Sequence, residues 1–214
     1  MNAELLDKLT IRQLVDDWII YSDGGFDWER FRAVWHDDGR MMATWTQGNA
    51  DEFVAMRKMS FEKGATSILH FHGAHTSDVS GDRATAQTKM MIMQRAPVEG
   101  VMCDVTCNGR FFDFFERRKG KWGFVHRQPI YEKDWITPCD PHNPPRLDPA
   151  LLQSFPEGYR HLAYLQTRLG FNVKKDMPGL KGPQVEGLYA AGRQWLAGAT
   201  DHPIVLCGRV GISH

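Results

Sequence analysis

The chain has 214 residues, and its 26 basic and 26 acidic side chains give a formal net charge of zero. This balance argues against a general nucleic-acid binder and against a protein held at a membrane surface by a basic patch. Hydrophobic residues make up 42% of the sequence and charged residues 24%, which is typical of a folded globular protein and excludes wholesale disorder.

The first residues lack the basic start and apolar run of a signal peptide, and no apolar stretch reaches the roughly 20 residues of a membrane helix. The cysteines form no C-x-x-C pair, so the sequence holds no zinc or dithiol redox motif. They are Cys103, Cys107, Cys139 and Cys207. We therefore expect a cytoplasmic protein with reduced thiols and with neither a membrane nor a nucleic-acid partner.

Apolar residues recur at helical spacing through the N-terminal part of the chain. Thr10 and Gln13 form a capping-box pattern that predicts the start of a first helix, and Gly24 predicts its end. A short strand is expected between the second helix and the third. The predicted helices span 10–24, 27–36 and 49–64, and the strand spans 41–46.

From residue 66 onward the pattern changes to long alternating segments separated by turn residues. The predicted strands span 67–79, 83–95, 101–116 and 121–131. Helices followed by an antiparallel meander are typical of an α+β domain. Because strands of this length twist strongly, we expect a curved antiparallel or mixed sheet whose concave face is covered by the N-terminal helices.

Prolines dominate the segment that follows. Five of them lie between residues 138 and 149, which excludes a helix interior or a central strand and predicts an extended arm. Two short helices are expected after it, over 157–169 and 183–196. We therefore divide the chain into a domain of residues 1–136 and a C-terminal extension of residues 137–214 that packs on this domain or on a neighbouring subunit.

Several short motifs follow one another between residues 8 and 136. They are Tyr21-Ser22-Asp23, Phe26-Asp27-Trp28-Glu29, Trp35-His36-Asp37-Asp38, Leu69-His70-Phe71 and Lys119-Gly120-Lys121-Trp122. In this combination the chain resembles the SnoaL-like branch of the nuclear transport factor 2-like superfamily. The resemblance implies a cone-shaped α+β barrel with a deep apolar pocket, usually in a dimer or trimer. Members include scytalone dehydratase, hexachlorocyclohexane dehydrochlorinase, bile acid dehydratase, polyketide cyclases and steroid isomerases, so the fold does not fix the reaction.

Asp23, in the last turn of the first helix, and His70, in the first long strand, are the leading catalytic candidates. The resemblance implies that they form a dyad inside the cone, as in the dehydratase and dehydrochlorinase branch. A carboxylate bonded to one imidazole nitrogen fixes the tautomer and raises the basicity of the other nitrogen, which can then move a proton. Without the resemblance, Asp23 is also consistent with a residue at a helix end or turn, and His70 with a structural histidine in the core.

Two further residues are candidates for positioning substrate oxygens. Tyr21 lies two residues before Asp23, and core packing is the alternative role for its ring. Arg127 lies on the last predicted strand, where some enzymes of the family hold an anionic or departing group with a basic residue. An ion pair on the outer face of the sheet is the alternative for Arg127. Strand alternation places Phe124 on the opposite face from Arg127.

The strand around His70 is rich in histidine. His70 and His72 share one face of a regular strand, and His75 is expected on the other. The H-x-H pair followed by Asp78 raises the alternative of a metal enzyme. Such a pair begins the metal site of cupin barrels. However, the glutamate that usually completes a cupin site is missing, and helices before this strand do not suit the cupin fold. We therefore expect no metal and place His72 in the wall of the pocket.

Aromatic side chains are expected to line the pocket. The candidate substrate-binding residues are Trp18, Trp45, Phe53, Phe111 and His72. The run over residues 111–115 is apolar on both faces of its strand, so one face must fill the pocket or core. The other face must be covered by a helix, the extension or a partner subunit, which favours a homodimer or homotrimer.

The sequence contains no P-loop, no dinucleotide-binding glycine motif and no G-x-S-x-G. The leading hypothesis is a lyase without a cofactor, in which His70 serves as base and then as acid while Asp23 orients it. It would release water or formaldehyde from a small apolar, aromatic substrate, as in the catabolism of aromatic compounds. The alternatives are a non-catalytic small-molecule-binding or assembly module, an isomerase and a polyketide cyclase.

Overall fold

The computed structural model describes residues 2–24, 27–64 and 67–205. Its helices are α1 (Ala3–Gly24), α2 (Trp28–Ala33), α3 (Ala50–Glu62), α4 (Pro149–Gln153), the short 3₁₀ helix η1 (Glu157–Tyr159), α5 (Arg160–Arg168) and α6 (Pro183–Leu196). Its strands are β1 (Trp35–Met42), β2 (Gln47–Asn49), β3 (Ser67–Ser80), β4 (Arg83–Val98), β5 (Val101–Arg118) and β6 (Lys121–Pro138). Phe26 and Cys207 lie outside the described residues, and the other three cysteines are free.

One sheet of six strands organises the chain, in the order β2-β1-β6-β5-β4-β3. All neighbours run antiparallel except β1 and β6, which are parallel. The predicted α+β class and mixed sheet are confirmed. The sheet is not closed into the barrel that the resemblance implies, because β2 and β3 stand at its two edges in the described part of the chain.

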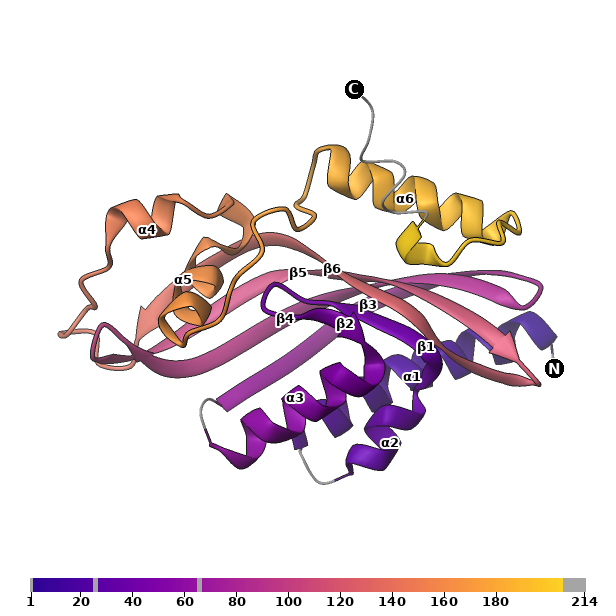
Figure 1. Ribbon diagram of the computed structural model, residues 1–214, viewed down its shortest axis with the longest axis horizontal. Coiled ribbons are helices and arrows are strands. Elements are labelled where there is room, and N and C mark those ends of the chain that lie inside the picture. Colours follow the sequence, from indigo (N-terminus) through magenta and orange to yellow (C-terminus); the bar gives the residue numbers. More distant parts are fainter. Residues whose placement is uncertain (1, 25–26, 65–66, 206–214) are drawn as a thin grey trace.

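The two faces of the sheet carry different helices. Figure 1 shows α1, α2 and α3 on one side of the long strands and α6 on the other, with α4 and α5 at one end. The apolar run of β5 explains this division, because Phe111 and Phe115 pack in the larger core cluster while Phe112 and Phe114 pack against α6. The second face of this run is thus covered by the chain's own extension. Phe71 stays 57% exposed on β3, and the dimer or trimer remains a prediction.

Two N-terminal elements differ from the sequence prediction. The first helix begins at Ala3 rather than Thr10, because the Asn2 side chain accepts a hydrogen bond from the Glu4 amide at 3.0 Å and caps an earlier turn. The strand predicted over 41–46 begins and ends earlier, as β1 (Trp35–Met42), and the helix predicted over 27–36 is correspondingly shorter. The cap of α3 is as expected, since Asn49 and Glu52 form a reciprocal capping box.

Irregularities in two strands change which side chains share a face. The pairing of β5 with β6 shifts register beside Phe124, so that Phe124 and Arg127 lie on the same face and their side chains stack at 4.5 Å. The predicted opposition of these two residues is therefore wrong. A second shift, between His72 and His75 on β3, turns His75 to the same face as His72, where its Nδ1 lies 2.8 Å from the Thr88 hydroxyl.

Gly192 gives α6 its close approach to the sheet. A Cβ atom at this position would lie 2.7 Å from Cζ of Phe112, whose ring is buried in the cluster beneath α6. We expect Gly192→Val to lower the free energy of unfolding by about 2 kcal/mol or more, because the helix must lift or the ring must leave its rotamer. Urea unfolding measures this. Gln194→Val, on the exposed face of the same helix, is the control, and an equal loss in both variants would contradict the prediction.

His126 makes stability depend on pH. It is 1% exposed, and neither ring nitrogen has a hydrogen-bond partner among the described residues. Burial, together with the nearby His202 and Arg40, lowers the pKa of His126 to about 3. The unfolded chain takes up a proton at this histidine near pH 6.5, whereas the folded chain does so only near pH 3. Between these two pH values, each unit of lower pH therefore reduces the folding equilibrium constant by about tenfold. Above about pH 6.5 His126 has no effect on stability.

We expect His126→Leu to remove this part of the acid sensitivity. The unfolded variant has no proton to gain at this position, so its stability should fall less between about pH 7 and about pH 4 than that of the wild type. Urea midpoints of both proteins across this range provide the measurement. Equal slopes would show that His126 does not stay neutral in the folded state.

Candidate active site

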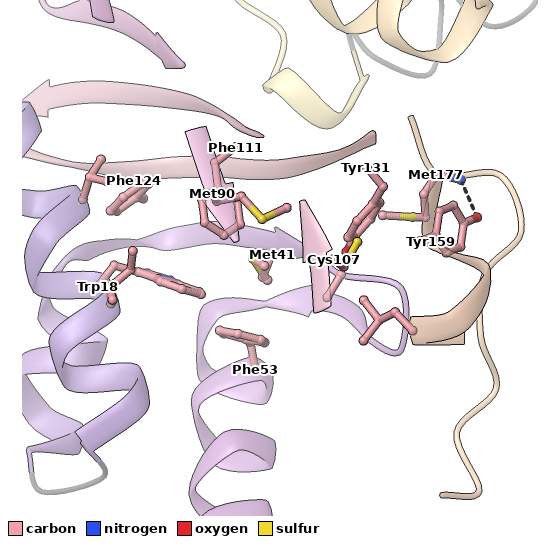
Figure 2. Close-up of a cluster of buried hydrophobic side chains, with 14 of the residues drawn as sticks. Trp18, Met41, Phe53, Met90, Cys107, Phe111, Phe124, Tyr131, Tyr159 and Met177 are labelled. Carbon is pink, nitrogen blue, oxygen red and sulfur yellow. Dashed lines mark hydrogen bonds between the residues drawn. The ribbon is translucent and has the colours of Figure 1, made fainter. Parts of the chain in front are cut away.

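A pocket lies between the N-terminal helices, the sheet and α5. It encloses about 710 Å³ of space outside the atoms, its open mouth included. Aromatic side chains from four elements and two loops make up much of its wall. They are Trp18, Trp45, Phe53, Phe111, Tyr131 and Phe171. Figure 2 shows Trp18, Phe53 and Phe111 grouped together in the buried cluster beside Met41. Of the predicted substrate-binding residues, Trp18, Trp45, Phe53 and Phe111 line the pocket.

Asp23 and His70 are in direct contact. His70 Nδ1 lies 2.6 Å from Asp23 Oδ1, and the backbone N–H of His70 donates to Asp23 Oδ2 at 2.5 Å. Both side chains are mostly buried, at 12% and 9% exposure. The two bonds hold the carboxylate in one orientation, so the proton on the imidazole is directed to Nδ1 and the Nε2 lone pair is left free.

The end of α1 and the inner face of β3 produce this contact. Asp23 is the penultimate residue of α1, five residues after Trp18, and Gly24 ends the helix. His70 faces inward because it is paired with Ile92, and both residues line the pocket. The Trp18 ring meets the His70 ring edge-on with centroids 5.5 Å apart, which fixes the imidazole plane. His70 Nε2 has no hydrogen-bond partner in the described residues and can therefore serve a ligand.

Tyr21 does not join the dyad. It is half-buried against the core, and its hydroxyl accepts a hydrogen bond from Nη1 of Arg30 at 3.0 Å. The side chain is absent from the pocket wall. An α-helix turns about 100° per residue, so Tyr21, two residues before Asp23, points to another side of α1. The Tyr21 side chain therefore lies away from the pocket, where it was predicted to position a substrate oxygen.

Arg127 faces inward and is paired with a carboxylate of the protein itself, although its Nη1 has no hydrogen-bond partner among the described residues. Its Nε and Nη2 both donate to Asp113 at 2.8 Å, and the two side chains are 0% exposed. The guanidinium also stacks on the rings of Trp18 and Phe111 at 4.4 and 4.2 Å. Arg127 thus lies behind the rings of Trp18 and Phe111 and outside the pocket wall. It has no access to a substrate, and its ion pair lies inside the fold and not on the outer face of the sheet.

His72 lies outside the pocket as well. Its Nε2 is 3.0 Å from Asp16, and its Nδ1 is 3.1 Å from Nη2 of Arg12, both on α1. These contacts connect β3 to α1, and the His72 ring does not line the pocket. Among the described residues, no three His, Cys, Asp or Glu side chains are grouped as a metal site would require.

The pocket also contains polar residues that sequence reasoning missed. Arg57 and Ser60 reach it from α3, Gln94 from β4, and Thr44 from the loop after β1, where its hydroxyl donates to Gln166 of α5 at 2.7 Å. The signal for Arg57 was its spacing of four residues from Phe53, which puts a cation in the inward stripe of the helix. Gln166 gave no such signal, because the extension reaches the pocket only through the tertiary fold.

The fold and the sequence define the family. A sequence profile of the SnoaL-like domain matches residues 3–128. The chain therefore belongs to the SnoaL-like family of the nuclear transport factor 2-like superfamily.

Among the described residues, no helix combines the length and the apolar character needed to cross a membrane.

Relatives match nearly the whole chain. Pea pathogenicity protein 2 of Fusarium vanettenii is 34% identical over 203 residues, which cover 90% of this chain and 87% of that protein. The uncharacterized protein AN9274 of Emericella nidulans is 34% identical over 210 residues, covering 91% and 87%. Since both matches extend well beyond residue 128, the C-terminal extension is shared with these relatives.

Solved structures share the fold at low identity. A hexachlorocyclohexane dehydrochlorinase, LinA type 2, matches with a TM-score of 0.55 and 17% identity over 68% of this chain and 96% of that one. A putative scytalone dehydratase from Novosphingobium aromaticivorans matches with a TM-score of 0.51 and 18% identity over 63% and 88%. At these identities the likeness establishes the fold, and the reaction has to be argued from the pocket.

Proposed function

We propose that this protein is a lyase that acts without a cofactor on a small, largely apolar aromatic substrate, by dehydratase-like elimination. One observation carries the proposal: a buried carboxylate bonded to His70 Nδ1 leaves the Nε2 of a pocket-lining imidazole free. A module that only binds a ligand has no need of this arrangement. The dehydratases and dehydrochlorinases among proteins of this fold agree with such chemistry.

The proposed reaction moves one proton and breaks one carbon–oxygen bond. His70 Nε2 removes a proton from a carbon next to an activating group, and Asp23 stabilises the imidazolium that forms. The electron pair of the broken C–H bond forms the new double bond as the C–O bond breaks. The leaving oxygen takes the proton back from Nε2 and departs as water, which restores the neutral imidazole.

The pocket wall supports the substrate class. The rings of Trp18 and Phe53 stack nearly parallel at 6.1 Å, and those of Trp45 and Phe171 lie 5.4 Å apart. Such walls bind planar apolar molecules through area burial and ring contacts. Leu162 and Gln166 of α5 also line the pocket, so the extension helps to keep water from a reacting substrate.

A turnover screen tests the proposal. Hydroxylated aromatic compounds are incubated with the full chain and with its His70→Ala variant, and products are followed by mass spectrometry. We expect at least one compound to lose water, or formaldehyde from a hydroxymethyl group, with the wild type alone. Binding of such compounds without conversion would favour the non-catalytic module, and conversion without mass change would favour an isomerase.

A further inference from the structure

Arg57 places a buried positive charge at the pocket. It lies on α3, one turn after Phe53, and lines the pocket with 6% of its surface exposed. Its Nη2 donates to the carbonyl oxygen of Ser22 at 3.0 Å. The same atom is 3.9 Å from Asp23 Oδ1, which is beyond hydrogen-bond distance. Arg57 and His70 therefore flank one carboxylate oxygen.

The hydrogen bonding of Arg57 is incomplete. A guanidinium has five N–H donors, and only the bond to Ser22 is formed within the described residues. Its Nε is buried and without a partner there. Burial lowers the pKa of Arg57, and Asp23 opposes that change only in part. Keeping a buried cation with unused donors is costly unless a further group completes it.

Comparison with Arg127 shows what is missing. Both arginines lie inside the fold on the same side of the sheet, but Arg127 has its own carboxylate partner in Asp113, with two hydrogen bonds of 2.8 Å. Asp23, the carboxylate near Arg57, accepts its hydrogen bonds from His70 instead. Arg57 therefore has an anion nearby, Asp23 at 3.9 Å, but no carboxylate within hydrogen-bond distance.

We propose that Arg57 binds a carboxylate of the substrate. This inference rests on the proposed function and narrows its substrate class to aromatic or conjugated acids, with the acid group beside the carbon that His70 deprotonates. A planar guanidinium matches a carboxylate in shape and charge, and the apolar wall strengthens the pairing because it excludes water. The aromatic residues bind the rest of the molecule.

Equilibrium binding to the full chain tests this without any turnover. The probes are two pairs of equal shape, 2-naphthoate with 2-naphthamide and benzoate with benzamide, titrated by calorimetry and by quenching of tryptophan fluorescence. We expect the wild type to bind at least one acid about tenfold or more tightly than its amide. If no acid binds more tightly than its amide, the proposal is wrong, and this result needs no variant.

Variants then assign the preference to Arg57. Arg57→Met should abolish the preference while changing amide affinity by less than about threefold, and Arg57→Lys should keep part of it because the charge remains. Lys58→Met removes the same charge from the exposed face of α3 and should leave the preference intact. Loss of affinity for acid and amide alike in Arg57→Met, or an unchanged preference, would assign Arg57 a structural role only.

The outcome can be separated from that of the lyase proposal. The titrations need no turnover, so the acid preference of the wild type and its loss in Arg57→Met are measured whether or not the protein converts any acid. An acid preference that depends on Arg57, in a protein that converts none of the acids, would support the binding site and count against the lyase.

Discussion

Replacing His70 by alanine is expected to lower kcat by about 10²–10⁴-fold on any substrate that the wild type converts. The proposed mechanism uses Nε2 twice, first as base and then as acid, and no other pocket-lining side chain offers an imidazole. The loss should appear in kcat more than in KM, because the apolar wall binds the substrate in either protein.

Asp23→Asn is expected to lower kcat nearly as far, for a different reason. The amide oxygen can accept from the His70 backbone N–H, which turns the NH₂ group toward Nδ1. Nδ1 must then accept that bond, so the ring proton moves to Nε2 and the base is lost. Steady-state kinetics with circular dichroism as a check of folding measures both variants.

A second histidine–aspartate pair provides the control. His161 on α5 has its Nδ1 2.9 Å from Asp134, and neither residue lines the pocket. His161→Ala should retain kcat within about threefold if proton transfer is what the dyad supplies. Full activity of both His70→Ala and Asp23→Asn in folded protein would refute the proposed mechanism.

Removing one partner of the Arg127–Asp113 pair is expected to cost about 3–5 kcal/mol of unfolding free energy. Both side chains are fully buried, and burial raises the pKa of Asp113 while Arg127 opposes that change. Asp113→Leu leaves the guanidinium charged among Trp18, Phe111 and Phe124 with no anion, and Arg127→Met leaves a buried carboxylate without a cation. Urea unfolding measures each variant.

The double variant separates charge burial from packing. Arg127→Met combined with Asp113→Leu replaces the pair by apolar side chains, so it should be more stable than either single variant. The exposed pair of Arg95 and Asp104 is the control, and breaking it should cost far less because solvent screens the two charges. A double variant as unstable as the sum of the singles would show that the two residues do not act as a pair.

Much of the fold was predictable from local pattern. The four long strands begin within a residue of their predicted starts, because turn residues and alternation are local properties of the chain. The helices Pro183–Leu196 and Ala50–Glu62 were marked by proline, glycine and capping residues. The resemblance added Asp23 and His70, whose contact no spacing rule could establish.

The sequence by itself therefore determined the α+β order, the four long strands with the turns between them, and the two residues of the dyad. Only the tertiary structure decided which arginine meets the pocket. A register shift beside Phe124 sets the face on which Arg127 lies, and Asp113 then neutralises it, while the packing of α3 against the end of α1 brings Arg57 to the carboxylate. Alternation has a period of two, so one inserted residue reverses every later side chain, and partners far apart in sequence leave no local signal.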